Sequence, residues 1–308
     1  MHRSRFVAPL CASLLLSSAA IGAAYDPLTV DPNFRTTPLD LTVHDARRDR
    51  DIPVRIYLPG SAKPAAVVLF SHGLGGSRHG NEFLGQDWAA RGYVAVFLQH
   101  PGSDDSVWRD KPREQRMGAM KDAASLKNFK LRAADVTAVL DQLAAWNAQS
   151  KQPLSGRMDL SRIGMSGHSF GALTTQAVSG ETFPFVGTKL TDPRIKAAIA
   201  FSPSAPAHGK AEKAFGAVKI PWLLMTGTKD VALVGRADLL SRLAVYPALR
   251  GAPKYEVVLN NAEHSAFTDR ALPGIRNHAI RTIIASCLRS RLPFGTPICA
   301  TMPMPSPG

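Results

Sequence analysis

Short runs of consecutive apolar residues alternate along this chain with segments in which apolar residues recur every three or four positions. Residues 65–70 and 93–98 are clear continuous runs, which are typical of strands buried on both faces of a sheet. Residues 121–146 are the clearest periodic segment and predict a long helix with one apolar face. Strands that alternate with helices in this way predict a mostly parallel central sheet flanked by helices, an α/β fold.

The remaining segments extend the same alternation. Residues 52–58 alternate in hydrophobicity and predict an early edge strand, whereas residues 100–118 are polar, follow neither period and are predicted to be irregular. No internal repeat or linker interrupts the chain, so residues 25–308 are predicted to form a single domain. The other predicted strands are 161–166, 195–201, 220–226 and 255–259, and the other predicted helices are 82–91, 169–179 and 274–289.

The first 24 residues differ from the rest. Arg3 and Arg5 precede an apolar run over residues 6–20, and small residues follow it just before Tyr25. This is the layout of a secretory signal peptide. The run is too short and too rich in small residues to serve well as a membrane anchor, which is the alternative. We therefore expect residues 1–24 to be removed and the protein to be exported to the periplasm or secreted.

Export changes how the three cysteines are interpreted. Cys11 would be removed with the signal peptide, which leaves Cys287 and Cys299. An even pair in an exported protein predicts one disulfide, which would tie the Pro-rich C-terminal tail to the last predicted helix. Two free thiols are the alternative.

The formal net charge of the chain is +13. Such a balance occurs in proteins that bind nucleic acids or anionic membranes. Here the lysines and arginines are scattered, with no dense cluster and no interleaved aromatic residues, so we expect no nucleic-acid partner. A generally basic surface is compatible with transient contact with an anionic membrane surface. The chain is expected to be a monomer.

A candidate nucleophile stands between a predicted strand and a predicted helix. Residues 167–171 read Gly-His-Ser-Phe-Gly and match Gly-x-Ser-x-Gly, which holds a serine on a sharp strand-to-helix turn. The two glycines leave room for the strand and the helix to pass closely, and the helix N-terminus favours developing negative charge. The pattern predicts Ser169 as the nucleophile, with an ordinary glycine-rich turn as the alternative.

A second glycine-rich segment, residues 71–76 (Ser-His-Gly-Leu-Gly-Gly), follows the strand at 65–70. In α/β-hydrolases one oxyanion donor is the amide after the nucleophile, here that of Phe170, and the other comes from a loop in this position. Leu74 is the predicted second donor, with Gly75 next. A phosphate-binding loop is disfavoured, because neither Gly-x-x-x-x-Gly-Lys-Ser/Thr nor Gly-x-Gly-x-x-Gly occurs here.

A serine nucleophile needs a base, and the expected chain order is serine, acid, histidine. His264 follows the strand at 255–259 in a loop and is the predicted base. His208 also lies in a loop, whereas His278 falls inside a predicted helix. His168 is expected to make a structural hydrogen bond instead.

The acid is predicted from the strand ends. Asp230 follows the strand at 220–226 and precedes His264 in the chain, which makes it the predicted acid. A helix cap is the alternative role for it. Asp192 precedes its strand and so lies at the wrong end, and Asp238 is expected within a helix.

These motifs together resemble the plasma-type platelet-activating-factor acetylhydrolase family and its bacterial relatives, which are often called dienelactone-hydrolase-like. The resemblance rests on residues 71–75, residues 90–94, His100 and residues 167–171, and it covers roughly residues 50–270. It implies the α/β-hydrolase fold and a hydrolase of short acyl esters that needs no cofactor, calcium or other metal ion.

The sequence departs from these families in two ways. Animal acetylhydrolases carry the acid after the strand that corresponds to 195–201, but here that strand ends in Ser202 and Pro203. Asp230 instead resembles the acid of dienelactone-hydrolase-type enzymes. True dienelactone hydrolases use a cysteine nucleophile, whereas this chain has Ser169.

The sequence therefore predicts an exported serine esterase for short-acyl esters that works through an acyl-enzyme, with a small-molecule or lipid ester as substrate. The same triad would serve an amidase, a peptidase or a polyester hydrolase, because the loops around it decide the substrate. Residues 101–120 and 203–218 are predicted to form that wall. Two other classes are a non-catalytic binding protein on the same fold and a lipid- or DNA-binding protein with salt-dependent affinity.

Overall fold

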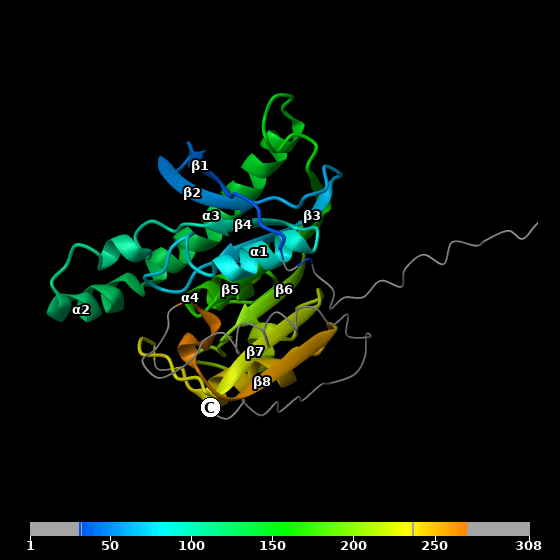
Figure 1. Cartoon of the computed structure of the whole chain (residues 1–308). Coiled ribbons are helices and arrows are strands. Elements are labelled where there is room, and N and C mark those ends of the chain that lie inside the picture. The colour runs from blue at the N-terminus through cyan, green and yellow to red at the C-terminus, as the bar shows by residue number, and fades with distance from the viewer. Residues whose placement is uncertain (1–30, 32, 236, 270–308) are drawn as a thin grey trace, which may run out of the picture.

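The computed structural model describes residues 31, 33–235 and 237–269. One eight-stranded sheet forms its centre, in the order β1-β2-β4-β3-β5-β6-β7-β8 (Figure 1). The β1/β2 and β2/β4 pairs are antiparallel and the other pairs are parallel, which confirms the predicted α/β-hydrolase fold. The strands are β1 (Leu39–Asp45), β2 (Arg50–Tyr57), β3 (Ala65–Ser71), β4 (Val94–Leu98), β5 (Met158–His168), β6 (Ile195–Phe201), β7 (Trp222–Lys229) and β8 (Lys254–Glu263).

Helices cover both faces of the sheet, which is why the central strands are apolar throughout. On one face, Trp88 packs its ring against Phe70 and Phe97. On the other face, Val136 and Leu140 belong to the same buried cluster as inward-facing residues of β3 and β4. The helices are α1 (Glu82–Ala90), α2 (Arg113–Ala123), α3 (Leu126–Ala148), α4 (Phe170–Val178), α5 (Ala211–Phe215), α6 (Leu239–Leu243) and α7 (Val245–Ala248), with 3-10 turns η1 (Asp105–Val107) and η2 (His264–Phe267).

The prediction that residues 52–58 form an edge strand was wrong. β2 lies between β1 and β4, and the side chains of Ile52, Val54 and Ile56 are fully buried. The outer position belongs to β1, in which Leu39, Leu41 and Val43 alternate with polar residues and only Val43 is buried. β1 was missed because its alternation contains only three apolar residues and no continuous apolar run.

The segment 121–146, predicted to be one long helix, is divided between two helices. The break falls at Ala124 and Ser125, between α2 and α3. Ser125 caps α3 by accepting a hydrogen bond from the amide of Asn128, and the Asn128 side chain donates to the carbonyl of Ala123. Because α2 begins at Arg113, part of the segment 100–118 is helical and not irregular as predicted.

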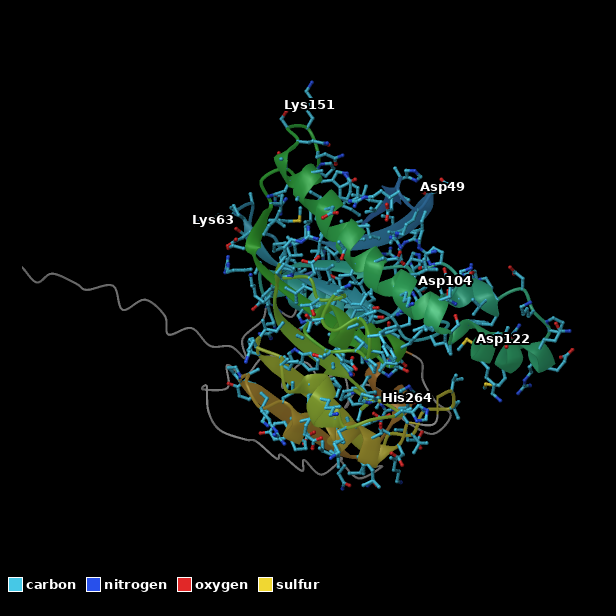
Figure 2. All side chains as sticks on the ribbon, turned by 180° about the vertical axis from the view of Figure 1, so that it is seen from behind. Asp49, Lys63, Asp104, Asp122, Lys151 and His264 are labelled. Atoms are coloured by element: carbon cyan, nitrogen blue, oxygen red, sulfur yellow. The ribbon has the colours of Figure 1, made fainter. Side chains whose placement is uncertain are left out.

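The carboxyl ends of the parallel strands meet at one edge of the sheet, where ligand sites of open α/β sheets lie. Figure 2 shows Asp104, which follows β4, and His264, which follows β8, on the same side of the molecule, with Lys63 on the opposite side. β8 continues four residues beyond its predicted end at 259, so His264 follows the strand directly, without the expected loop.

Several predictions concern parts of the chain outside the described residues. They are the signal peptide at 1–24, the helix at 274–289 with His278, and the disulfide between Cys287 and Cys299. The single domain at 25–308 stays a prediction for the same reason. In the part of the chain that the structure describes, no helix has the length and hydrophobicity needed to cross a membrane.

Candidate active site

Ser169 occupies the turn between β5 and α4 with φ 57° and ψ −114°. This is a strained backbone conformation for a residue other than glycine. A Cβ atom on Gly171 would lie 1.9 Å from the carbonyl oxygen of Ser71, and one on Gly167 would lie 2.3 Å from that of Gly171. Only glycine fits at these two positions, so the sequence dictates a tight elbow that presents the serine at the carboxyl edge of the sheet.

Two hydrogen bonds connect the predicted nucleophile, base and acid. His264 Nε2 lies 2.9 Å from Ser169 Oγ, and His264 Nδ1 lies 2.7 Å from Asp230 Oδ1. A carboxylate only accepts, so Nδ1 carries the proton and Nε2 is left to accept from the serine hydroxyl. This geometry would let a proton move from the serine to the imidazole while the carboxylate fixes the orientation of the ring.

Asp230 is fully buried, and its second oxygen also accepts hydrogen bonds. Ser202 Oγ donates to Asp230 Oδ2 at 2.6 Å and Thr226 Oγ1 donates to the same atom at 2.9 Å. Burial alone would raise the pKa of Asp230. The hydrogen bond from His264 and the positive charge of Arg242 outweigh it and hold that pKa below its usual value. Ser202, the residue directly after β6, thus supplies a hydroxyl to the acid that follows the next strand, β7.

Arg242 of α6 is a site residue that the sequence analysis missed. Its Nε forms an ion pair with Asp230 Oδ1 at 2.9 Å, and its Nη1 donates to the carbonyl of Ser202 at 2.8 Å. Its Nη2 lies 3.2 Å from His264 Nδ1, which already donates to the carboxylate, so this contact is a nearby charge and not a hydrogen bond. No motif marks Arg242, because its role depends on where α6 packs against the end of β7.

His168, next to the nucleophile, makes the structural hydrogen bond that was expected. Its Nε2 donates to the carbonyl oxygen of His264 at 3.0 Å. Burial, with the nearby His264 ring, lowers the pKa of His168 to about 3, so it stays neutral. It therefore fixes the backbone of His264 without adding charge to the site.

The rejected candidates that the structure describes are not part of the hydrogen-bonded set of Ser169, His264 and Asp230. Asp192 pairs with Arg194, 2.6 Å away, just before β6, at the end expected for it. Asp238 precedes α6 and does not lie inside a helix as predicted; its carboxylate caps α6 by accepting from the amide of Ser241. His208 lines the cleft beside the site.

The predicted oxyanion donors, Leu74 and Phe170, line the same cleft as Ser169. Phe170 is the first residue of α4, so its amide has no acceptor within the helix. Both amides are therefore candidates for binding a developing negative charge beside the serine.

His72 orients the peptide group that carries the Leu74 amide. Its Nδ1 donates to the carbonyl of Gly73 at 2.7 Å, while its Nε2 accepts from the amide of His100 at 3.1 Å. The amide of Gly76 donates to the same Gly73 carbonyl at 3.0 Å. Two donors on one carbonyl polarise the peptide and strengthen its N–H as a donor. Burial, together with the charge of Arg132, holds the pKa of His72 well below its usual value, so the clamp stays neutral.

Arg132 joins this loop to the helix that begins at the serine. The fully buried guanidinium donates to Ser71 Oγ at 3.0 Å, to the carbonyl of His72, and to Thr174 Oγ1 in α4 at 3.0 Å. It also lies 4.7 Å from the centre of the Phe170 ring. Burial lowers the pKa of Arg132 to about 9, which leaves it cationic at neutral pH. One side chain thus contacts the segments of both predicted oxyanion donors.

His100, one of the residues that carry the family resemblance, belongs to the layer beneath this loop. Its Nε2 lies 2.9 Å from Ser71 Oγ and its Nδ1 lies 3.0 Å from Asp135 Oδ2. Burial, with the charge of Arg132, lowers the pKa of His100 to about 4. We therefore assign it a supporting role, as a neutral residue that holds the start of the oxyanion loop.

Replacing His72 with phenylalanine is expected to lower kcat for p-nitrophenyl acetate by about 10- to 100-fold, with little change in KM. The ring volume remains but the Leu74 amide loses its orientation, and a lost oxyanion donor costs ~10²–10³ in rate. Steady-state kinetics test this, with His44→Phe on the exposed β1 as the control. A higher KM at unchanged kcat would contradict the assigned role.

A cleft of about 1250 Å³ opens above Ser169 and is lined mainly by apolar atoms. Both segments predicted as its wall contribute, the first through Met120 and the second through residues 204–210. The loops at 181–184 and 232–235 complete the wall and were not predicted from the sequence. In the described residues, no group of three or more His, Cys, Asp or Glu side chains could hold a metal ion.

Comparison with known proteins adds a family and a fold. A family model described as "PETase: PET hydrolase-like" matches residues 54–280. A solved Klebsiella pneumoniae protein provisionally described as a dienelactone hydrolase is 17% identical, with a TM-score of 0.59, over 84% of this chain and 100% of its own. An acylaminoacyl peptidase from Pyrococcus horikoshii is 17% identical, with a TM-score of 0.55, over 84% of this chain and 42% of its own. No curated protein matches the chain. The structural likenesses, at this identity, are to the fold alone.

Proposed function

The chain belongs to the PET hydrolase-like family, and we propose that it is a serine hydrolase that cleaves carboxylic esters, with Ser169 as nucleophile, His264 as base and Asp230 as acid. The observation that carries this proposal is the pair of hydrogen bonds that joins the three side chains at the carboxyl edge of the sheet, on a strained serine elbow.

The proposed reaction has two steps. Ser169 Oγ attacks the ester carbonyl carbon while its proton passes to His264 Nε2, and the amides of Leu74 and Phe170 hold the oxyanion. The bond to the alcohol oxygen then breaks as His264 returns the proton to that oxygen. Water next attacks the acyl-enzyme, gives a proton to His264 and releases the acid, and the proton returns to Ser169. Asp230 stays ionised and stabilises the imidazolium that forms in each step.

The cleft is larger than the ~300–1,000 Å³ of ordinary small-molecule sites, at about 1250 Å³. A short acyl group would therefore fill it only in an ester with an extended alcohol arm. Such an ester agrees with the predicted short-acyl and lipid-ester substrates. The family description favours a polyester hydrolase as the second candidate, and an amidase or peptidase shares the same chemistry. Export and transient membrane contact remain part of the proposal.

The proposal is tested on p-nitrophenyl esters from acetate to palmitate and on the matching p-nitroanilide of acetic acid. We expect ester hydrolysis that weakens as the acyl chain lengthens, and far slower cleavage of the anilide. A preference for palmitate would overturn the short-acyl prediction alone. Comparable rates on the anilide would make an amidase the better assignment.

A further inference from the structure

Glu181 is a buried carboxyl group in the same cleft as Ser169, and the proposed mechanism does not use it. Only 5% of its surface is exposed, and it lines the cleft where the chain leaves α4. Its amide donates to the carbonyl of Gln176 at 3.0 Å, which turns the chain back against the last turn of the helix. The carboxyl group therefore lies at the distal end of α4, whereas the nucleophile lies at the start of that helix.

No cation neutralises this carboxyl group within the described residues. None of the other charged or titratable groups that line the same cleft forms an ion pair with Glu181; they are His72, His168, His208, Lys210, Lys213, Arg242, His264 and Asp269. Asp192, whose amide donates to Val178 at the end of α4, pairs with Arg194 instead. Burial raises the pKa of Glu181 to about 8, opposed in part by a hydrogen bond with Gln176. The carboxyl group is therefore protonated at neutral pH and carries an O–H donor.

Gln176, the neighbour of Glu181 in α4, has a fixed side chain. Gln176 is held by Ser204 through two hydrogen bonds, with Nε2 donating to the carbonyl at 2.9 Å and Oε1 accepting from the amide at 3.1 Å. The two hydrogen bonds fix the side chain of Gln176, so the wall beside Glu181 is ordered before a substrate binds.

We propose that the carboxyl group of Glu181 forms a distal subsite that donates a hydrogen bond to an uncharged acceptor, such as a carbonyl oxygen, in an extended arm of the ester substrate. The nine-residue helix α4 spans about 14 Å at ~1.5 Å per residue, so the acceptor lies at that order of distance from the scissile carbonyl. The inference rests on the proposed ester hydrolysis and adds where, and by which atoms, the substrate is recognised.

The test compares esters that differ by one oxygen atom. For the acyl arm, p-nitrophenyl dodecanoate is compared with derivatives in which a ketone replaces one methylene at successive positions along the chain. For the alcohol arm, dodecyl acetate is compared with the same set of ketones. The readout is the ratio of kcat/KM for the ketone to that for its parent within one enzyme, so a general loss of activity cancels. We expect this ratio to reach a maximum of roughly threefold to tenfold when the ketone stands at a distal position on one arm.

Two substitutions of Glu181 test whether the hydrogen-bond donor itself, and not the packing around it, raises the ratio. Glu181→Leu is expected to lower the ratio to about one, whereas Glu181→Gln, which keeps N–H donors, retains most of it. The matched control is Glu256→Leu, which removes a half-buried carboxyl group on β8 whose pKa burial also raises, to about 7, but which does not line the cleft. In the control the ratio stays at its wild-type value.

The pH dependence provides a readout that loss of packing would not produce. In the wild type the ratio should fall as the pH rises past about 8, because ionised Glu181 becomes a pure acceptor and repels the ketone oxygen. In Glu181→Gln the ratio stays constant with pH. A ratio near one at every position on both arms, or one that survives in Glu181→Leu, would overturn the subsite. If the wild type cleaves no ester, the proposed function fails separately, and the affinities of Ser169→Ala for ketone and parent then decide about the subsite.

Discussion

Replacing Ser169 with alanine is expected to lower kcat for p-nitrophenyl acetate by about 10⁴- to 10⁶-fold, the loss seen when a triad nucleophile is removed. The variant keeps the cleft, the two oxyanion amides and the His264–Asp230 hydrogen bond, so the residual rate reports what these provide without a covalent step. Steady-state kinetics measure the loss, and intact-mass analysis after treatment with a fluorophosphonate should show one adduct on the wild type and none on the variant.

Ser179→Ala is the matched control for this experiment. Ser179 is buried just after α4, and its hydroxyl has no hydrogen-bond partner in the described structure. Its removal tests whether loss of a buried serine hydroxyl near this helix disturbs the enzyme, and we expect nearly wild-type rates. An active Ser169→Ala variant, or one still labelled at the same peptide, would show that another residue is the nucleophile.

The fold was predictable where burial dominates local sequence. Residues 65–70 and 94–98 lie in strands with helices on both faces, so these positions had to be apolar, and β3 and β4 follow from that pattern. β1 escaped prediction because an exposed edge strand needs no such run. The break at Ser125 was missed because a single capping serine hardly disturbs the apolar period on either side of it.

The candidate site also contains residues that could be predicted from the sequence and residues that could not. Ser169, Asp230 and His264 follow strand ends, so chain order and strand position were enough to select them, and the structure brings the three together. Arg242 and Arg132 were missed because each is a lone arginine on a helix. Only packing shows that these two guanidinium groups are buried against the acid and the oxyanion loop.

Replacing Asp230 with asparagine is expected to lower kcat by about 10³- to 10⁴-fold. The carboxylate accepts hydrogen bonds from three donors in the structure, His264 on one oxygen and Ser202 and Thr226 on the other, and Arg242 forms an ion pair with the first oxygen. An amide has only one oxygen. If its NH₂ group faces His264, the imidazole must carry its proton on Nε2 and cannot accept from Ser169. If its oxygen faces His264, the ring keeps its tautomer but loses the negative charge that stabilises the imidazolium.

The free energy of unfolding distinguishes this loss of kcat from a loss of folded protein. Arg242 is buried and would lose its counterion, so Asp230→Asn should also be destabilised by about 3–5 kcal/mol, the range for a broken buried ion pair. Since folding lowers the pKa of Asp230, its charge stabilises the wild type above the unfolded value of about 4, and this stabilisation is lost as the pH falls through the lower folded pKa. The difference in unfolding free energy between wild type and variant should therefore shrink in acid. Asp192→Asn, which breaks the pair with Arg194 at the opposite edge, is the control and should remain active. An Asp230→Asn variant that is folded and fully active would remove Asp230 from the triad.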